Sequence, residues 1–284
     1  HDPQRIHHSR GALRQAPMTD TPSPLEIHDL TVSYQRKPVL YGIDLVVGEG
    51  SLVGVIGPNG AGKSTLIKSI MGMIPHNGGW VKIFGKPPGK SCSRVGYVPQ
   101  RESVDWDFPV SVLDVVLMGR YNHAGWFRRV GKKDRRIACE CLEKVNMLPF
   151  ADRQIGKLSG GQQQRVFLAR ALAQESDLYL MDEPFAGVDA VTEKAIIEVL
   201  RELKSQGKSL VVVHHDLSTA REYFDQLVLL NMRLIAVGKV EDTFTRDLLQ
   251  KTYGGRLTIF TEVADQSAGI REYDKERRSV SSME

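Results

Sequence analysis

The sequence predicts an α/β fold: a parallel sheet covered by helices, with an antiparallel β subdomain at its start and an inserted helical subdomain. Three observations predict it. A strand, a glycine-rich turn and a helix follow one another over 51–73. Helices and strands alternate over 162–213, which is typical of parallel strands joined by helical crossovers. Over about 100–157 the pattern is helical instead.

The chain opens with a hairpin-like region. Apolar and polar residues alternate over Leu25–Tyr34 and Val39–Val47, which predicts two neighbouring antiparallel strands. Ser51–Ile56 is mostly apolar and predicts a buried strand. The helix after the glycine-rich turn is predicted over Lys63–Met73.

Within the helical subdomain, the apolar segment Val112–Met118 and the amphipathic segment Lys132–Val145 are separated by an aromatic and basic linker, Trp126–Arg129. The elements after the subdomain end in two short strands and a helix. They are predicted at Gln162–Gln174, Leu178–Met181, Val191–Ser205, Ser209–Val213, Gln226–Asn231, Arg233–Val237 and Arg246–Lys251.

The chain divides into one domain and two terminal segments. The domain is expected over 18–260, long enough to bury a substantial core. Residues 1–17 precede Met18 and contain three histidines, so we interpret them as a disordered extension or a cloning remnant. Residues 261–284 are rich in charge and serine and poor in apolar side chains, which predicts disorder.

Composition argues against several classes of protein. The chain has 41% hydrophobic and 25% charged residues, an ordinary globular balance. Its longest apolar stretches, such as Leu210–Val213, are far shorter than the roughly 18 residues of a membrane span. No leader for secretion is evident, so we expect a cytosolic location. The three cysteines lack the spacing of a metal site and are interpreted as reduced thiols.

The net charge of +4 is too small to indicate nucleic-acid binding. Segment 1–17 contains three arginines and one aspartate, so it supplies +2 and leaves about +2 for the rest of the chain. We expect no nucleic-acid partner.

The glycine-rich turn matches the phosphate-binding P-loop pattern G-x-x-x-x-G-K-[ST], and it lies between a predicted strand and a predicted helix, as that motif requires. Its glycines let backbone N–H groups converge on phosphate oxygens, and the helix N-terminus adds its dipole. Lys63 supplies a positive charge near the β- and γ-phosphates of ATP, and Ser64 a ligand for Mg²⁺. The predicted nucleotide-binding residues are Gly57, Pro58, Asn59, Gly60, Ala61, Gly62, Lys63, Ser64 and Thr65.

Two carboxylates follow a second apolar strand. Leu178–Met181 leads directly into Asp182 and Glu183, about 120 residues after the P-loop. The carboxyl ends of parallel strands face the ligand in such sheets. We predict that Asp182 holds Mg²⁺ and that Glu183 positions and polarises the attacking water, which together with the P-loop gives a phosphoryl-transfer site.

A second polar helix start precedes the helix predicted from Gln162. A serine and free backbone N–H groups at a helix start can also face an anion. The motif is Leu158-Ser159-Gly160-Gly161-Gln162, and with it the sequence resembles the ABC ATPase family over roughly 25–260. The resemblance implies a homodimer closed across two ATP molecules, in which Ser159, Gly161 and Gln162 contact the γ-phosphate of the partner subunit's ATP. Gly160 belongs to the same ATP-binding segment.

Four further positions match the family in order. By resemblance, Tyr34 stacks on adenine, and Gln100 contacts Mg²⁺ and the attacking water. His215 corresponds to the switch histidine at the γ-phosphate, and Asp189 to an aspartate at the dimer interface. Taken singly, the first three are equally consistent with a strand-end aromatic, a loop amide and a surface histidine.

The sequence also departs from the family pattern. The segment 184–189 reads Pro-Phe-Ala-Gly-Val-Asp where many relatives have Ser-Ala-Leu-Asp, and His214 stands where threonine or serine often precedes the switch histidine. Because two histidines are adjacent, the assignment of His215 depends on the Asp216 that follows it.

The segment after Gln100 resembles the manganese, zinc and iron branch of ABC importers, and manganese fits best. The resemblance rests on the segments 100–112, 118–121 and 125–129. It implies an ATPase that powers metal import as a peripheral subunit at the cytoplasmic face of the inner membrane. Its partners would be membrane permease subunits and, indirectly, an extracytoplasmic metal-binding protein. Trp106 and Phe108 would line a groove for a short permease helix, or else anchor the helical subdomain.

Two alternatives stand beside manganese import. Within the transport class, the cargo could be zinc or an iron chelate. Outside it, the chain could be an ABC ATPase of DNA repair, chromosome organisation or translation. Only about 95 residues separate Lys63 from Ser159, with no sustained heptad, which argues against the long coiled coil of chromosome-type members. A single cassette argues against the translation type, which usually carries two.

Overall fold

The structure is a computed structural model that describes residues 22–34, 37–104, 106, 108–121 and 130–254. Its strands are β1 (Leu25–Tyr34), β2 (Lys37–Val47), β3 (Leu52–Ile56), β4 (Gly78–Ile83), β5 (Val95–Val98), β6 (Leu178–Asp182), β7 (Ser209–Val213), β8 (Gln226–Asn231) and β9 (Arg233–Lys239). Its helices are α1 (Lys63–Ile70), α2 (Val112–Met118), α4 (Lys132–Lys144), α5 (Gly160–Ala173), α6 (Ala190–Ser205), α7 (Leu217–Tyr223), α8 (Val240–Thr243) and α9 (Arg246–Tyr253).

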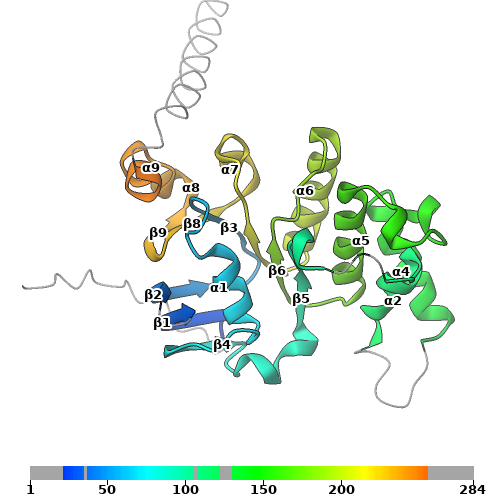
Figure 1. The fold of residues 1–284 in the computed structure, drawn as a ribbon, viewed down its shortest axis with the longest axis horizontal. Coiled ribbons are helices and arrows are strands. Elements are labelled where there is room, and N and C mark those ends of the chain that lie inside the picture. Colours follow the sequence, from blue (N-terminus) through cyan, green and yellow to red (C-terminus); the bar gives the residue numbers. More distant parts are fainter. Residues whose placement is uncertain (1–21, 35–36, 105, 107, 122–129, 255–284) are drawn as a thin grey trace, which may run out of the picture.

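The strands form two sheets (Figure 1). The smaller sheet has three antiparallel strands in the order β2-β1-β4. The larger has six strands in the order β5-β6-β7-β3-β8-β9, and only the β8–β9 pair within it is antiparallel. The expected antiparallel β subdomain and helix-covered parallel sheet are therefore confirmed.

The larger sheet is covered on both faces, so its central strands are apolar throughout. On β3, Val53 and Val55 pack in one buried cluster with α1 and the smaller sheet. Leu52 and Ile56 point to the opposite face, where the buried cluster contains residues of α2, α4, α5 and α6. Each fully buried aliphatic side chain contributes about 1.5–3 kcal/mol relative to exposure. The carboxyl ends of β3 and β6 are thereby held in a rigid frame.

Several boundaries differ from the sequence-based predictions. Helix α1 ends at Ile70 rather than Met73, because Gly72 takes a left-handed φ of 71°. Hydrogen bonds from Gly72 N to Ser69 O and from Met73 N to Lys68 O close the helix. Strands β4 and β5 and helices α7 and α8 were not predicted. β4 opens on two glycines, and β5 and α8, at four residues each, are too short to show a period.

The helical region lies to one side of the sheet, where α2 and α4 pack against α5 (Figure 1). A buried ionic group joins the three helices. The guanidinium of Arg120, just after α2, contacts Asp134 of α4 (Nε–Oδ1, 3.2 Å) and Glu175 beyond α5 (Nη1–Oε2, 2.6 Å). Removing one partner of a buried ion pair typically costs about 3–5 kcal/mol, so this contact fixes α2 and α4 to α5.

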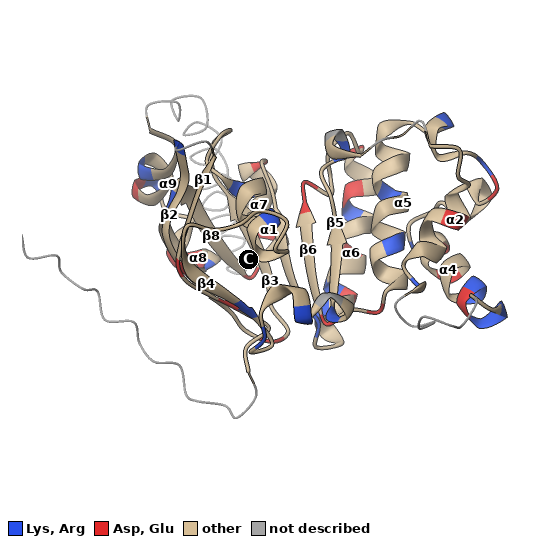
Figure 2. Cartoon of the chain, turned by 60° about the horizontal axis from the view of Figure 1, so that its bottom comes forward, with Lys and Arg blue, Asp and Glu red and all other residues tan. Residues whose placement is uncertain are grey.

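Some of the compositional expectations can be checked in the described residues. None of the helices there is long and apolar enough to cross a membrane. Cys139 and Cys141 are free thiols, as expected, and burial raises the pKa of Cys141 to about 11. Helix α4 carries both basic and acidic side chains, whereas the charged side chains of α5 are all basic (Figure 2). The terminal segments 1–17 and 261–284 and the linker Trp126–Arg129 lie outside the described residues.

Candidate functional site

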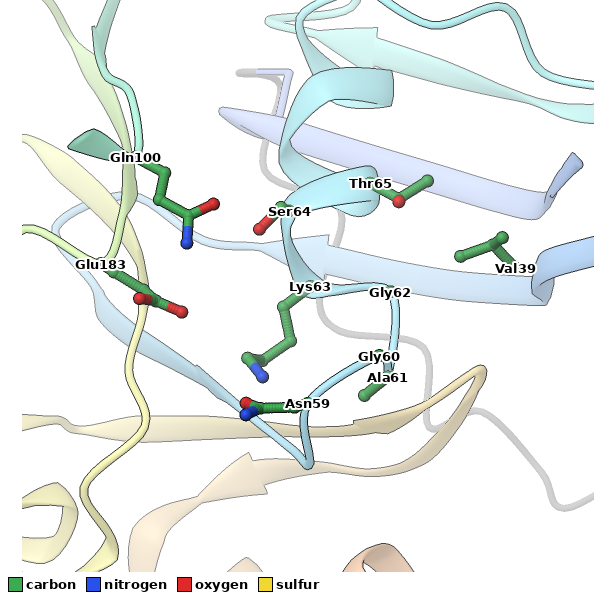
Figure 3. A pocket seen from close by; sticks show the side chains of 10 residues that line it. All are labelled: Val39, Asn59, Gly60, Ala61, Gly62, Lys63, Ser64, Thr65, Gln100 and Glu183. Atoms are coloured by element: carbon green, nitrogen blue, oxygen red, sulfur yellow. The ribbon is translucent and has the colours of Figure 1, made fainter. Parts of the chain in front are cut away.

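A pocket of about 400 Å³ opens at the carboxyl ends of β3 and β6. The P-loop forms one wall, and the side chains of Gln100 and Glu183 reach toward it from the β5 and β6 side (Figure 3). Val39 of β2 contributes from the smaller sheet. The lining residues are Val39, Asn59, Gly60, Ala61, Gly62, Lys63, Ser64, Thr65, Gln100 and Glu183.

The backbone of the P-loop requires glycine at particular positions. Gly60 and Gly62 have φ values of 81° and 93°, in the left-handed region that glycine tolerates best. At Gly57 the constraint is space, because a Cβ there would lie 2.0 Å from the carbonyl oxygen of Leu230. The loop is also held by a hydrogen bond from Met232 N to Ala61 O at 2.9 Å. Strand β8 and the turn after it therefore brace the loop from behind.

Lys63 is buried at the centre of the site, with 6% of its surface exposed. Its Nζ donates hydrogen bonds to the carbonyl oxygens of Gly57 at 2.8 Å and Pro58 at 3.0 Å. Burial lowers its pKa, and the nearby carboxylates of Glu183 and Asp182 oppose that shift. A phosphate group bound in the pocket would favour the charged ammonium.

Asp182 and Ser64 bring two oxygen atoms together beside the pocket. Ser64 Oγ donates a hydrogen bond to Asp182 Oδ1 at 3.1 Å. Asp182 is fully buried, its pKa is raised chiefly by that burial, and its Oδ2 has no hydrogen-bond partner among the described residues. A carboxylate and a hydroxyl are hard oxygen donors, and proteins usually hold Mg²⁺ through one or two carboxylates together with substrate phosphates. This pair fits Mg²⁺.

Glu183 stands in a strained backbone conformation. Its φ of 53° lies in the left-handed region, which costs a non-glycine residue about 1–3 kcal/mol. The surrounding structure holds it there, because its carbonyl oxygen accepts hydrogen bonds from Ala186 N at 3.1 Å and Gln164 Nε2 at 3.4 Å. The resulting turn directs the carboxylate into the pocket beside Gln100 (Figure 3).

The second helix start is exposed, and its residues are not part of the pocket wall. Ser159 caps α5, with its Oγ accepting from Gln162 N at 3.4 Å and its N donating to Gln162 Oε1 at 2.9 Å. Gly161 lies against the loop after Glu183, because a Cβ on it would meet the carbonyl oxygen of Gly187 at 2.6 Å. The structure thus separates Ser159, Gly160, Gly161 and Gln162 from the chain's own P-loop pocket and leaves Ser159 accessible.

Three further predicted residues, Tyr34, Asp189 and His215, do not line the pocket. Tyr34 is 46% exposed at the end of β1, opposite Lys37 in the hairpin, and Val39 rather than Tyr34 lines the pocket. Asp189 is exposed and caps α6, accepting hydrogen bonds from the backbone N of Val191 and Thr192. His215 is exposed.

The two adjacent histidines differ sharply in environment. His214 is only 1% exposed, its Nε2 lies 2.8 Å from Thr219 Oγ1, and its ring meets that of Phe185 edge-on at 5.4 Å. Phe185 belongs to the segment 184–189 that departs from the family pattern, and it contacts His214, the other departure. Of the two histidines, His214 is buried and His215 is exposed, and the assignment of His215 as the switch histidine stays a prediction.

The sequence reasoning missed Val39, Gln164 and the buried role of His214. Gln164 had a usable signal, because a glutamine on the core-facing side of an amphipathic helix must find hydrogen-bond partners. It is 1% exposed and contacts the carbonyl oxygen of Glu183. Val39 gave no signal, since any apolar strand residue fits its pattern.

The fold and the pocket together define a P-loop nucleotide-binding protein. A family model described as ABC transporter matches residues 40–186. The chain therefore belongs to the ABC transporter family, and it is an ATPase coupled to transport.

Two relatives and one solved structure illustrate which members of the family the chain is similar to. The chain is 59% identical over 239 residues to the manganese transport system ATP-binding protein MntB of Bacillus subtilis, covering 84% of this chain and 96% of the relative. It is 56% identical over 243 residues to the zinc transport system ATP-binding protein TroB of Treponema pallidum, covering 86% and 91%. A dimeric ATP-binding cassette, MJ0796 bound to ADP and Pi in a post-hydrolysis state, is similar with a TM-score of 0.69 and 29% identity, covering 76% of this chain and 98% of the other.

His214 predicts a pH dependence of stability. Burial lowers its pKa to about 4, whereas an unfolded histidine titrates near 6.5. As the pH falls, the unfolded chain gains this proton first, so stability is full above about pH 6.5 and is lost toward pH 4. Between pH 7.5 and 5 this residue should cost about 2 kcal/mol. Urea unfolding of the wild type and His214→Gln at both pH values checks this, and equal losses in both proteins would contradict it.

Proposed function

We propose that this chain is the ATP-hydrolysing subunit of an importer for a transition metal ion, and that the ion is manganese. The observation that carries the proposal is a complete P-loop pocket, with Lys63, Asp182 and Glu183 converging on it, in a chain 59% identical to a manganese transport ATP-binding protein. Zinc is the second candidate, because the 56% identical relative is a zinc transport ATP-binding protein.

The residues in and beside the pocket have different roles in ATP hydrolysis. The P-loop N–H groups and Lys63 bind the phosphates and stabilise charge that develops on them. Glu183 orients a water molecule toward the γ-phosphate and accepts its proton, while Gln100 contacts the same water from the end of the neighbouring strand β5. Ser64 and Asp182, with Gln100 nearby, would hold Mg²⁺, which would supply positive charge to neutralise the phosphates.

The exposed second helix start supports a dimer. Ser159 and its neighbours do not line their own chain's pocket, so they are available to a nucleotide on another copy. A head-to-tail homodimer would place each Ser159 segment over the partner's P-loop, with Asp189 and His215 at the junction and Tyr34 at adenine. A similar cassette, MJ0796 with ADP and Pi, is dimeric.

The remaining partners are membrane permease subunits and, through them, an extracytoplasmic metal-binding protein. The chain would then act at the cytoplasmic face of the inner membrane. Phe108 is 61% exposed beside the helical region and is available to a permease helix. Trp106 instead packs edge-on against Phe167 at 5.0 Å, which fits an anchor of the helical region.

Uptake of metal by the intact transporter tests the cargo. Cells expressing it should accumulate Mn²⁺, and the same transporter carrying Lys63→Ala should not, because phosphate binding loses its central charge. Uptake of labelled Mn²⁺ is measured against unlabelled Mn²⁺, Zn²⁺ and Fe²⁺. Stronger competition by Zn²⁺ than by Mn²⁺ would overturn manganese in favour of zinc.

The catalytic role of Glu183 predicts a trapped dimer. Glu183→Gln removes the proton acceptor at similar volume and should lower ATP turnover by about 10²- to 10⁴-fold. Binding should persist, so with Mg-ATP the variant should accumulate as a dimer in size-exclusion chromatography. Glu198→Gln, at an exposed glutamate of α6, is the matched control. Near-normal turnover in Glu183→Gln would remove Glu183 from the mechanism.

If Ser159 acts at the dimer interface, a change there should affect ATP-driven dimerisation but not nucleotide binding by the P-loop. Ser159→Arg introduces a bulky charge at the proposed interface and should block ATP-driven dimerisation, while a fluorescent ATP analogue still binds the P-loop. Lys63→Ala should weaken the binding of the analogue itself. Equal loss of nucleotide binding in both variants would show that Ser159 acts through folding.

A further inference from the structure

Arg101, the residue after Gln100, reaches across to the start of α5. It opens a short 3₁₀ turn, Arg101–Ser103, and its Nε donates a hydrogen bond to Gln163 Oε1 at 3.0 Å. The same guanidinium lies against Gly160, where a Cβ would meet Nε at 2.8 Å and Cζ at 3.0 Å. Gly160 thus leaves room for Arg101 to seat on the first turn of α5.

The backbone of this turn is fixed to the same helix. Trp106 Nε1 donates to the carbonyl oxygen of Arg101 at 2.9 Å, and the Trp106 ring packs on Phe167 of α5. Ser103 Oγ donates to the carbonyl oxygen of Gln100 at 2.7 Å. Arg101 is therefore held at its main chain and at its side chain, and both anchors connect the Gln100 segment to α5.

Gln164 provides a second connection on the other side of Gln100. Its Nε2 donates to the carbonyl oxygens of Pro99 and Glu183, each at 3.4 Å. The first turn of α5 therefore contacts the residues on both sides of Gln100 and the backbone of Glu183. Figure 1 shows α5 beside β5 and β6, the strands that precede these residues.

We propose that Arg101, acting through Gln163, is a positioning residue that couples the chain's own nucleotide pocket to the Ser159 segment. Gln100 lines that pocket, and Arg101 is its covalent neighbour. A shift of Gln100 toward bound nucleotide moves the guanidinium and, with it, the start of α5 that faces the partner's ATP. The inference rests on the proposed dimer and identifies what links its two sites within one chain.

The test uses Arg101→Ala in the full chain, alone and combined with Glu183→Gln. Nucleotide binding to the P-loop should stay within about twofold of the parent. Dimer affinity with Mg-ATP should fall about tenfold, the lower end expected for a lost hydrogen bond to a charged group. In the hydrolysing protein, the Hill coefficient for ATP should fall toward 1. Arg136→Ala, which removes an exposed arginine of α4, is the matched control and should change neither quantity.

The variant Gln163→Met, alone and combined with Arg101→Ala, tests whether Arg101 acts through its hydrogen bond to Gln163. If Arg101 acts through Gln163, the double variant loses no more dimer affinity than Arg101→Ala alone. Additive losses would overturn the coupling, as would an Arg101→Ala protein that dimerises normally or that loses nucleotide binding to the same extent. If Glu183→Gln itself forms no dimer, the proposed dimer fails instead, so the two failures are distinguishable.

Discussion

The burial of two charged side chains, Lys63 and Asp182, is the constraint on which the rest of this structure depends. Lys63 and Asp182 are both buried, yet neither neutralises the other through a direct contact: the lysine donates to two P-loop carbonyls, and the aspartate accepts from Ser64. Taking an ion out of water costs several kcal/mol even after relaxation. The apolar sheet and the helices that cover it must supply that energy. Because both side chains are already positioned and partly dehydrated, they need little rearrangement when a nucleotide binds.

The helix α5 connects this charged centre to the rest of the molecule. Its first turn carries Ser159 as a cap on the outside and Gln164 on the inside, where the amide touches the strained backbone of Glu183. Its far end is tied by Arg120 to the helical region. One helix thus connects the backbone of Glu183, the exposed Ser159 and, through Arg120, the helical region.

Local patterns predicted the fold class and the chemical core of the site. A P-loop, or a strand that ends in two carboxylates, is encoded by neighbouring residues, so Lys63, Ser64, Asp182 and Glu183 could be found without a structure. The burial of His214 against Phe185 could not, because it depends on two segments that meet only in three dimensions. The contact between Arg101 and Gln163 could not be predicted either, because these residues are also far apart in the sequence. Short elements such as β5 were not predicted either, because four residues are too few to show a hydrophobic period.

The bracing of the P-loop by β8 has a consequence for biosynthesis. β3 pairs with β7 and β8, and Gly57 packs against Leu230, about 170 residues later in the chain. At roughly 5–20 residues per second of synthesis, that separation corresponds to about 10–35 seconds on the ribosome. During this interval the emerging chain already carries its phosphate-binding loop but lacks the strand that shapes it. The native shape of the loop is thus completed only after β8 has been made.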